Sequence, residues 1–299
     1  MKYITTFLAA IICTSVLYAQ NRNITTEYPS QIFYGYNSDE LKNLQNGGTL
    51  YVLLTGDPIF DDSLSSAVKQ FWKVTPYKIV TLKDADALMA DENNNFLAPS
   101  TGFDDKFTIG SPLKNKRISE LTMFHGGKKK QHALGRCLFV YSYWLGANNQ
   151  TYISEENGLG YEIKALNDEL SIIITQKIDK LSNFKSINAE PYPVVKNEIN
   201  KNVKILKDKV LLLDAAWGKF LFKEKSMKGY KYQYQYVEPS ELLSLIKANP
   251  SKYCFIGYNP NSDIEIYDAQ TKTLIYSEFQ KHSMSNSEQI EQLNDLISK

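Results

Sequence analysis

Two carboxylates stand where alternating strands and helices would place catalytic acids. Asp57 follows the apolar run at residues 50–54, and Asp214 follows the apolar run at residues 210–213. Ligands of open α/β sheets bind at the carboxyl ends of the strands. Two carboxyl groups within about 5 to 10 Å of each other can act as acid and base in glycoside hydrolysis. Asp57 and Asp214 therefore support a hydrolase hypothesis, although an acid between a strand and a helix is more often a helix cap.

Trp217, three residues after Asp214, has two interpretations. Its ring would line a pocket for a sugar, or it would pack in the core as most tryptophans do.

The run from His125 to His132, His-Gly-Gly-Lys-Lys-Lys-Gln-His, is a second candidate site. Its glycines let backbone amides turn toward an anion, Lys128 and its neighbours add positive charge, and the histidines can titrate or donate. A phosphate or carboxylate would suit this pattern. A polar connection between two strands, with the glycines making the turn, suits it as well.

A third candidate is the tyrosine-rich segment at residues 230–237, which alternates aromatic and polar residues. In a strand this alternation places Tyr230, Tyr232, Tyr234 and Tyr236 on one face. If that face is open, its rings suit a peptide or a glycan. If a helix covers it, the tyrosines form part of the core.

Sequence motifs of catalysis are missing. The chain contains no nucleophile elbow, zinc-protease motif, dinucleotide-binding glycine motif, phosphate loop or Cys-x-x-Cys. Its three histidines are too dispersed in sequence to predict a zinc site. We therefore expect no metal and no cofactor, and a binding protein more readily than an enzyme.

The elements that would position these residues occur twice in one order, which predicts an α/β fold, or a mixed α+β one, of two similar units with mixed sheets. Each unit has the order strand, helix, strand, short helix, strand, and then two antiparallel strands. In the first unit, residues 42–148, the segments are 50–54, 61–72, 77–81, 83–91, 96–98, 118–124 and 137–144. In the second unit, residues 206–299, they are 210–213, 215–225, 230–237, 239–246, 253–258, 264–267 and 273–276, followed by a helix from about residue 287.

A helical connection at residues 149–205 is expected between the units. Its first helix carries one apolar stripe with helical spacing, made of Leu166, Leu170, Ile173, Ile174, Ile178 and Leu181. A second helix is predicted through Val195, Ile199 and Val203, and residues 20–41 are expected to form an N-terminal arm.

The element order of the second unit, which ends in a hairpin and a helix, is similar to that of the thioredoxin fold. The resemblance covers about a third of the chain. Thioredoxin-like redox chemistry would need a cysteine pair after the first strand, and the chain has Asp214-Ala-Ala-Trp217-Gly there. The resemblance therefore implies a fold without that chemistry.

The first 19 residues are typical of a cleavable signal peptide: Lys2, an apolar run at residues 7–17, and Ala19 at the cut. The apolar run is too short to span a bilayer. Lipid attachment at Cys13 is disfavoured because bulky Ile12 precedes it. We expect a periplasmic or extracellular protein without an integral membrane segment.

The net charge and the cysteines bear on two further questions, nucleic-acid binding and disulfide formation. The chain has 34 basic and 33 acidic residues, so loss of Lys2 with the signal peptide leaves a net charge of zero. A nucleic-acid partner, which would favour a basic face, is not expected. Cys137 and Cys254 each lie in an apolar run, which leaves open a disulfide or two buried thiols.

These features predict an exported, soluble envelope protein that binds an envelope protein, a peptide or a glycan without catalysis. The binding surface would be the cleft between the units or the tyrosine face. The alternative is the exported hydrolase.

Overall fold

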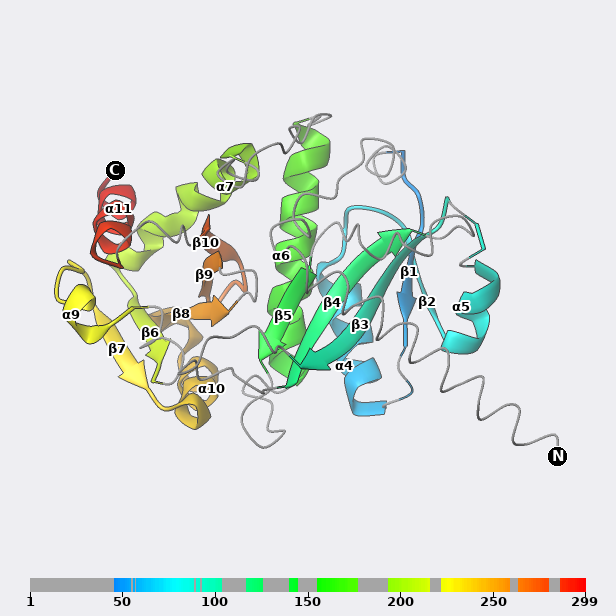
Figure 1. The fold of residues 1–299 in the computed structure, drawn as a ribbon, viewed down its shortest axis with the longest axis horizontal. Coiled ribbons are helices and arrows are strands. Elements are labelled where there is room, and N and C mark those ends of the chain that lie inside the picture. The colour runs from blue at the N-terminus through cyan, green and yellow to red at the C-terminus, as the bar shows by residue number, and fades with distance from the viewer. Residues whose placement is uncertain are drawn as a thin grey trace.

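The computed structural model describes residues 46–54, 56, 58–88, 90–91, 93–103, 117–125, 140–144, 155–176, 193–215, 222–258, 263–279 and 286–299. These residues form a mixed α/β protein with two five-stranded sheets. The long helix α6 (Glu155–Thr175) lies between the sheets in Figure 1. The predicted signal peptide and N-terminal arm lie outside the described residues and stay predictions.

The first sheet has the strand order β2-β1-β3-β4-β5. Strand β1 is parallel to β2 and β3, whereas β4 is antiparallel to both β3 and β5. Each predicted strand of this unit is present, and β3 is longer than predicted because it pairs with β4 along its whole length. The elements are β1 (Leu50–Leu53), α4 (Pro58–Phe71), β2 (Tyr77–Val80), α5 (Leu82–Leu88), β3 (Asn95–Phe103), β4 (Arg117–His125) and β5 (Val140–Trp144).

The second sheet has the order β10-β9-β8-β6-β7. Strand β6 is parallel to β7 and β8, while β9 is antiparallel to both β8 and β10. The predicted hairpin is thus confirmed as β9 and β10. The elements are β6 (Val210–Asp214), α9 (Glu224–Met227), β7 (Tyr234–Val237), α10 (Pro239–Ala248), the short 3-10 helix η5 (Pro250–Lys252), β8 (Tyr253–Tyr258), β9 (Asp263–Asp268) and β10 (Leu274–Phe279).

The predicted resemblance to the thioredoxin fold stays a prediction. Strand β8 runs parallel to β6, as β7 does. The three strands β7, β6 and β8 therefore form a parallel unit of the kind that helices connect.

Helix α6 is buried more extensively than its predicted apolar stripe implied. Leu166, Leu170 and Ile173 are buried as expected, but so are Glu162 and Glu169. The reason is the position of the helix: one buried cluster joins its apolar side chains to residues of both sheets. A helix that is covered on two sides has no broad face toward solvent. Polar residues such as Glu162 and Glu169 are therefore buried along with the apolar ones.

The remaining helices close the second sheet. Helix α7 (Pro193–Asn200) continues directly into the 3-10 helix η4 (Lys201–Lys207), and the predicted C-terminal helix is α11 (Asn286–Ser298). A second buried cluster contains Leu213 of β6, Val203 of η4 and Leu293 of α11. The second sheet thus packs on α6 with one face and on α11 and η4 with the other.

Cys254 of β8 is a buried free thiol, so the disulfide alternative for this residue is wrong. Burial raises its pKa to about 12, with a further contribution from the charge of Asp268. Cys137 lies outside the described residues. None of the described helices has both the length and the apolar character that crossing a membrane requires.

Candidate functional site

Of the two carboxylates in the hydrolase hypothesis, only Asp214 lies within the described residues. Asp214 is half-buried at the carboxyl end of β6, where it lies beside Val237 of β7. Asp57 and Trp217 lie outside the described residues. The distance between the two carboxyl groups is therefore untested, and the hydrolase stays a prediction.

The histidine and lysine run is also mostly outside the described residues. His125 is the last residue of β4 and its backbone lies opposite Asn95 of β3. The side chain of His125, together with Lys128 and His132, is not among the residues described.

The tyrosine row is the predicted site that the structure describes completely. Its rings form a continuous series of edge-to-face contacts: Tyr230 with Tyr232 and with Tyr234, and Tyr234 with Tyr236, at centroid distances of 5.7, 6.0 and 5.9 Å. Tyr230 is buried, whereas the other three are half-buried against the second cluster. The four tyrosines thus lie on one side, as predicted. Their rings are neither open to solvent nor fully covered, with Tyr230 the most buried of the four.

The strand beneath the row is shorter than predicted. It begins at Tyr234 rather than at Tyr230, because the backbone before Tyr234 forms hydrogen bonds with α11. The Lys231 N–H donates to Oδ1 of Asn294 at 3.0 Å, and Nδ2 of Asn294 donates to the Gly229 carbonyl at 2.8 Å. Asn294 therefore fixes the start of the row to the C-terminal helix.

Strand β7 is an outer strand of the second sheet. The carbonyls of Gln233 and Val237 accept hydrogen bonds from Leu211 and Ala215, at 3.0 and 2.7 Å, and so point toward β6. Backbone groups alternate in direction along a strand. The N–H and C=O of Tyr234 therefore point to the outer edge of the sheet.

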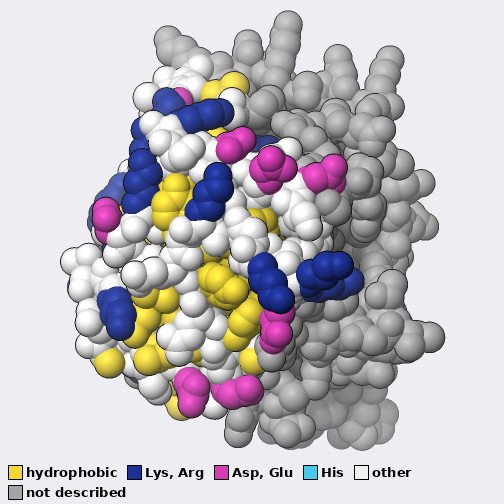
Figure 2. Space-filling view, turned by 90° about the vertical axis from the view of Figure 1, so that its left-hand side faces the viewer, with side chains coloured by type: hydrophobic (Ala, Val, Ile, Leu, Met, Phe, Trp, Pro, Cys, Tyr) yellow, Lys and Arg dark blue, Asp and Glu magenta, His cyan; other side chains and the backbone are white. Residues whose placement is uncertain are grey.

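Positive charge precedes the tyrosine row. Lys223, Lys225, Lys228 and Lys231 are exposed, and Glu224 is the one acid among them. Figure 2 shows this end of the molecule, where hydrophobic side chains group together with charged side chains around them. The lysines give the start of the row a local excess of positive charge, whereas exposed Glu238 and Glu241 follow β7.

The two ends of the row, Tyr230 and Tyr236, have raised pKa values. Burial raises the pKa of Tyr236 to about 12, helped by Tyr234 and by the charge of Glu224. Burial also raises the pKa of Tyr230 well above its ordinary value. The Tyr236 hydroxyl donates to the Phe222 carbonyl at 2.6 Å, which anchors the last ring of the row.

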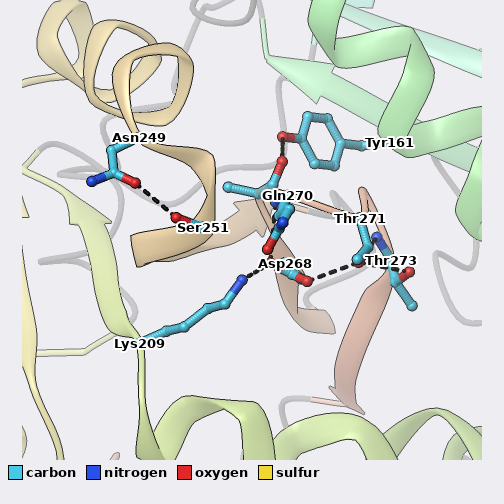
Figure 3. A network of polar contacts seen from close by, with 9 residues as sticks. Tyr161, Lys209, Asn249, Ser251, Asp268, Gln270, Thr271 and Thr273 are labelled. Carbon is cyan, nitrogen blue, oxygen red and sulfur yellow. Dashed lines mark hydrogen bonds and ion pairs between the residues drawn. The ribbon is translucent and has the colours of Figure 1, made fainter.

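A buried polar network in the β9–β10 turn was not predicted from the sequence (Figure 3). Lys209 forms an ion pair of 2.5 Å with Asp268, which also accepts from the Thr271 hydroxyl at 2.8 Å and the Gln270 N–H at 3.1 Å. Tyr161 of α6 donates to the Ala269 carbonyl at 3.0 Å. Because the Asp268 carboxylate already has three partners, the network holds the hairpin rather than offering a catalytic acid.

Lys272 extends from the same turn to helix α4, which connects β1 to β2 of the first sheet. Its Nζ lies 5.3 Å from the centre of the Tyr161 ring and 5.7 Å from that of Phe71 in α4. Partial burial lowers the pKa of Lys272. The contact is a cation–π clamp between the hairpin and the helices α6 and α4.

Within the described ranges, no three histidine, cysteine or acidic side chains come together as metal ligands would. No known protein family, curated protein or solved structure matches the chain.

Proposed function

We propose that this chain is an exported, non-catalytic binding protein of the cell envelope, periplasmic or extracellular, that takes up an extended peptide segment of a partner along β7. The peptide would add a strand to the outer edge of the second sheet, and the tyrosine row would contact its side chains.

The single observation that carries the proposal is the coincidence of the tyrosine row with an outer strand. Tyr234 points its backbone groups to the edge while its half-buried ring belongs to the row. Strand addition draws affinity from backbone hydrogen bonds and specificity from side-chain pockets. Both requirements are present at one residue, which favours a peptide over a glycan.

The charge next to β7 indicates which residues the partner peptide should carry. The four exposed lysines before β7 favour a segment with acidic residues at one end. Tyrosine supplies a large amphipathic contact area and is frequent among the residues that dominate binding energy.

The same strand order in both sheets supports the further proposal that the chain consists of two similar βαβαβββ units. In the first unit the strand that corresponds to β7 is β2. It carries one half-buried tyrosine, Tyr77, in place of a row. The two edges therefore provide a matched pair, of which only β7 is expected to bind.

The test is a selection of short random peptides on the full chain, with a glycan array in parallel, followed by affinity measurements. Tyr234→Ser should weaken binding of the selected peptides at least about tenfold, because truncation of a tyrosine that dominates an interface costs about 2 kcal/mol or more and about 1.4 kcal/mol corresponds to a factor of ten. Tyr77→Ser is the matched control on β2, and its affinity should equal that of the unaltered protein.

Equal effects of the two substitutions would reject β7 as the binding edge. Selection of glycans alone would reject the peptide.

A further inference from the structure

Three carboxyl groups are buried together between α6 and the second sheet. Glu162, Glu169 and Glu265 are 7%, 6% and 4% exposed. The first two lie seven residues apart, two turns along one side of α6, and Glu265 lies on β9. Three ionised carboxylates in one interior region would repel one another and would each lose hydration.

Hydrogen bonding is unequal within this group. Glu265 accepts a hydrogen bond of 2.7 Å from the Tyr267 hydroxyl. The Tyr267 ring is fixed in turn, because it stacks on Phe255 and lies across Gly257. Oε2 is buried without a hydrogen-bond partner in both Glu162 and Glu169, and Glu169 makes a further interaction.

Four lysines of the described elements around α6 have partners other than Glu162. Lys164 pairs with Asp168 on α6, Lys196 of α7 pairs with Glu278 of β10, and Lys209 pairs with Asp268. Lys272 lies against the rings of Tyr161 and Phe71.

Among the described residues, the charges that act on Glu162 are those of Glu265 and Glu169. Burial raises its pKa well above the ordinary range, and the charges of Glu265 and Glu169 raise it further. Burial and the same three glutamates raise the pKa of Tyr267. The hydroxyl of Tyr267 thus keeps its proton and remains a donor to Glu265.

We propose that Glu162 holds a proton in the folded protein, and that this proton couples the packing of α6 on the second sheet to the pH of the surroundings. A proton removes the charge that lacks a partner, so the helix and the sheet can remain in contact. Loss of the proton places a further negative charge beside Glu169 and Glu265. The inference does not depend on the proposed peptide binding.

The direction of the pH effect follows from the raised pKa. In the unfolded chain Glu162 loses its proton near its ordinary pKa of about 4.3. In the folded protein it keeps the proton to a higher pH. Between these two values the folded state binds the extra proton, so stability is greatest below the unfolded pKa and falls as pH rises. One linked proton lowers the folded-to-unfolded ratio by up to about tenfold per pH unit.

The experiment is chemical denaturation of the full chain between pH 5 and pH 9, compared with that of Glu162→Gln. The substitution keeps the shape of the side chain and removes the titration. We expect the unaltered protein to lose stability with rising pH and the variant to lose less, by up to about tenfold in the folding equilibrium per pH unit. Glu291→Gln, at an exposed position of α11, is the control and should keep the slope of the unaltered protein.

A second measurement needs no variant. Carbon NMR of the glutamate carboxyl groups in the folded protein should reveal one group that titrates well above the ordinary range. A Glu162→Gln slope equal to that of the unaltered protein, or normal titration of every glutamate, would overturn the proposal. If the variant does not fold, the NMR titration decides alone.

Discussion

Lys209 and Asp268 form a buried ion pair, with Nζ and Oδ1 2.5 Å apart. Lys209 directly precedes β6 and Asp268 ends β9, so the pair joins the start of β6 to the β9–β10 turn. Both charges are withdrawn from water, and each depends on the other for compensation.

Replacement of Lys209 by methionine should therefore strongly lower the free energy of unfolding. Removing one partner of a buried pair leaves an uncompensated charge and costs about 3 to 5 kcal/mol. Urea denaturation measures this loss. Lys204→Met, at an exposed position of η4, is the control and should change stability by less than about 0.5 kcal/mol. If the two variants unfold alike, the pair does not hold the sheet.

Gly257→Ala tests the close packing of β8 beneath Tyr267. A Cβ atom at this position would lie 2.5 Å from Cε2 of the Tyr267 ring. Overpacking of this kind costs about 1 to 3 kcal/mol. At Gly229 the nearest atom would be 3.4 Å away, an ordinary contact. Thermal unfolding should thus shift for Gly257→Ala and stay nearly constant for Gly229→Ala, and equal shifts would contradict the described packing.

Lys272 combines a clamp with a left-handed backbone, at φ 58°. Glycine adopts this region freely, whereas a residue with a Cβ loses about 1 to 2 kcal/mol there. Lys272→Gly and Lys272→Ala both remove the cation–π contacts, but the alanine variant should be less stable by about 1 kcal/mol. Denaturation of the two variants side by side measures the difference. A more stable alanine variant would show that the turn does not adopt this conformation.

Local chemistry made much of the fold predictable. The segment predicted at residues 239–246 is helix α10, whose first turn holds Pro239 and Glu241, two residue types that favour a helix start. The alternation around Ile264 and Ile266, followed by a polar turn, gave the β9–β10 hairpin. These signals lie within a few residues of the structure they specify.

Contacts between distant parts of the chain were not predictable in this way. Lys209 and Asp268 are 59 residues apart, and no periodicity brings a lysine to that aspartate. The buried state of Glu162 depends on a sheet that covers what would otherwise be the solvent side of α6. Strand β7 begins at Tyr234 rather than at Tyr230, because the Asn294 side chain of α11 donates a hydrogen bond to the Gly229 carbonyl just before it. In each case a tertiary contact outweighed the local pattern.

The most direct test of the account is hydrogen exchange of the unaltered protein, with and without a peptide selected on it. Strand addition predicts slower exchange at the outward-facing amide of Tyr234, with β2 unchanged as the corresponding edge of the first sheet. Protection that spares β7 and appears at β2, or at the carboxyl end of β6 near Asp214, would contradict binding at the tyrosine row.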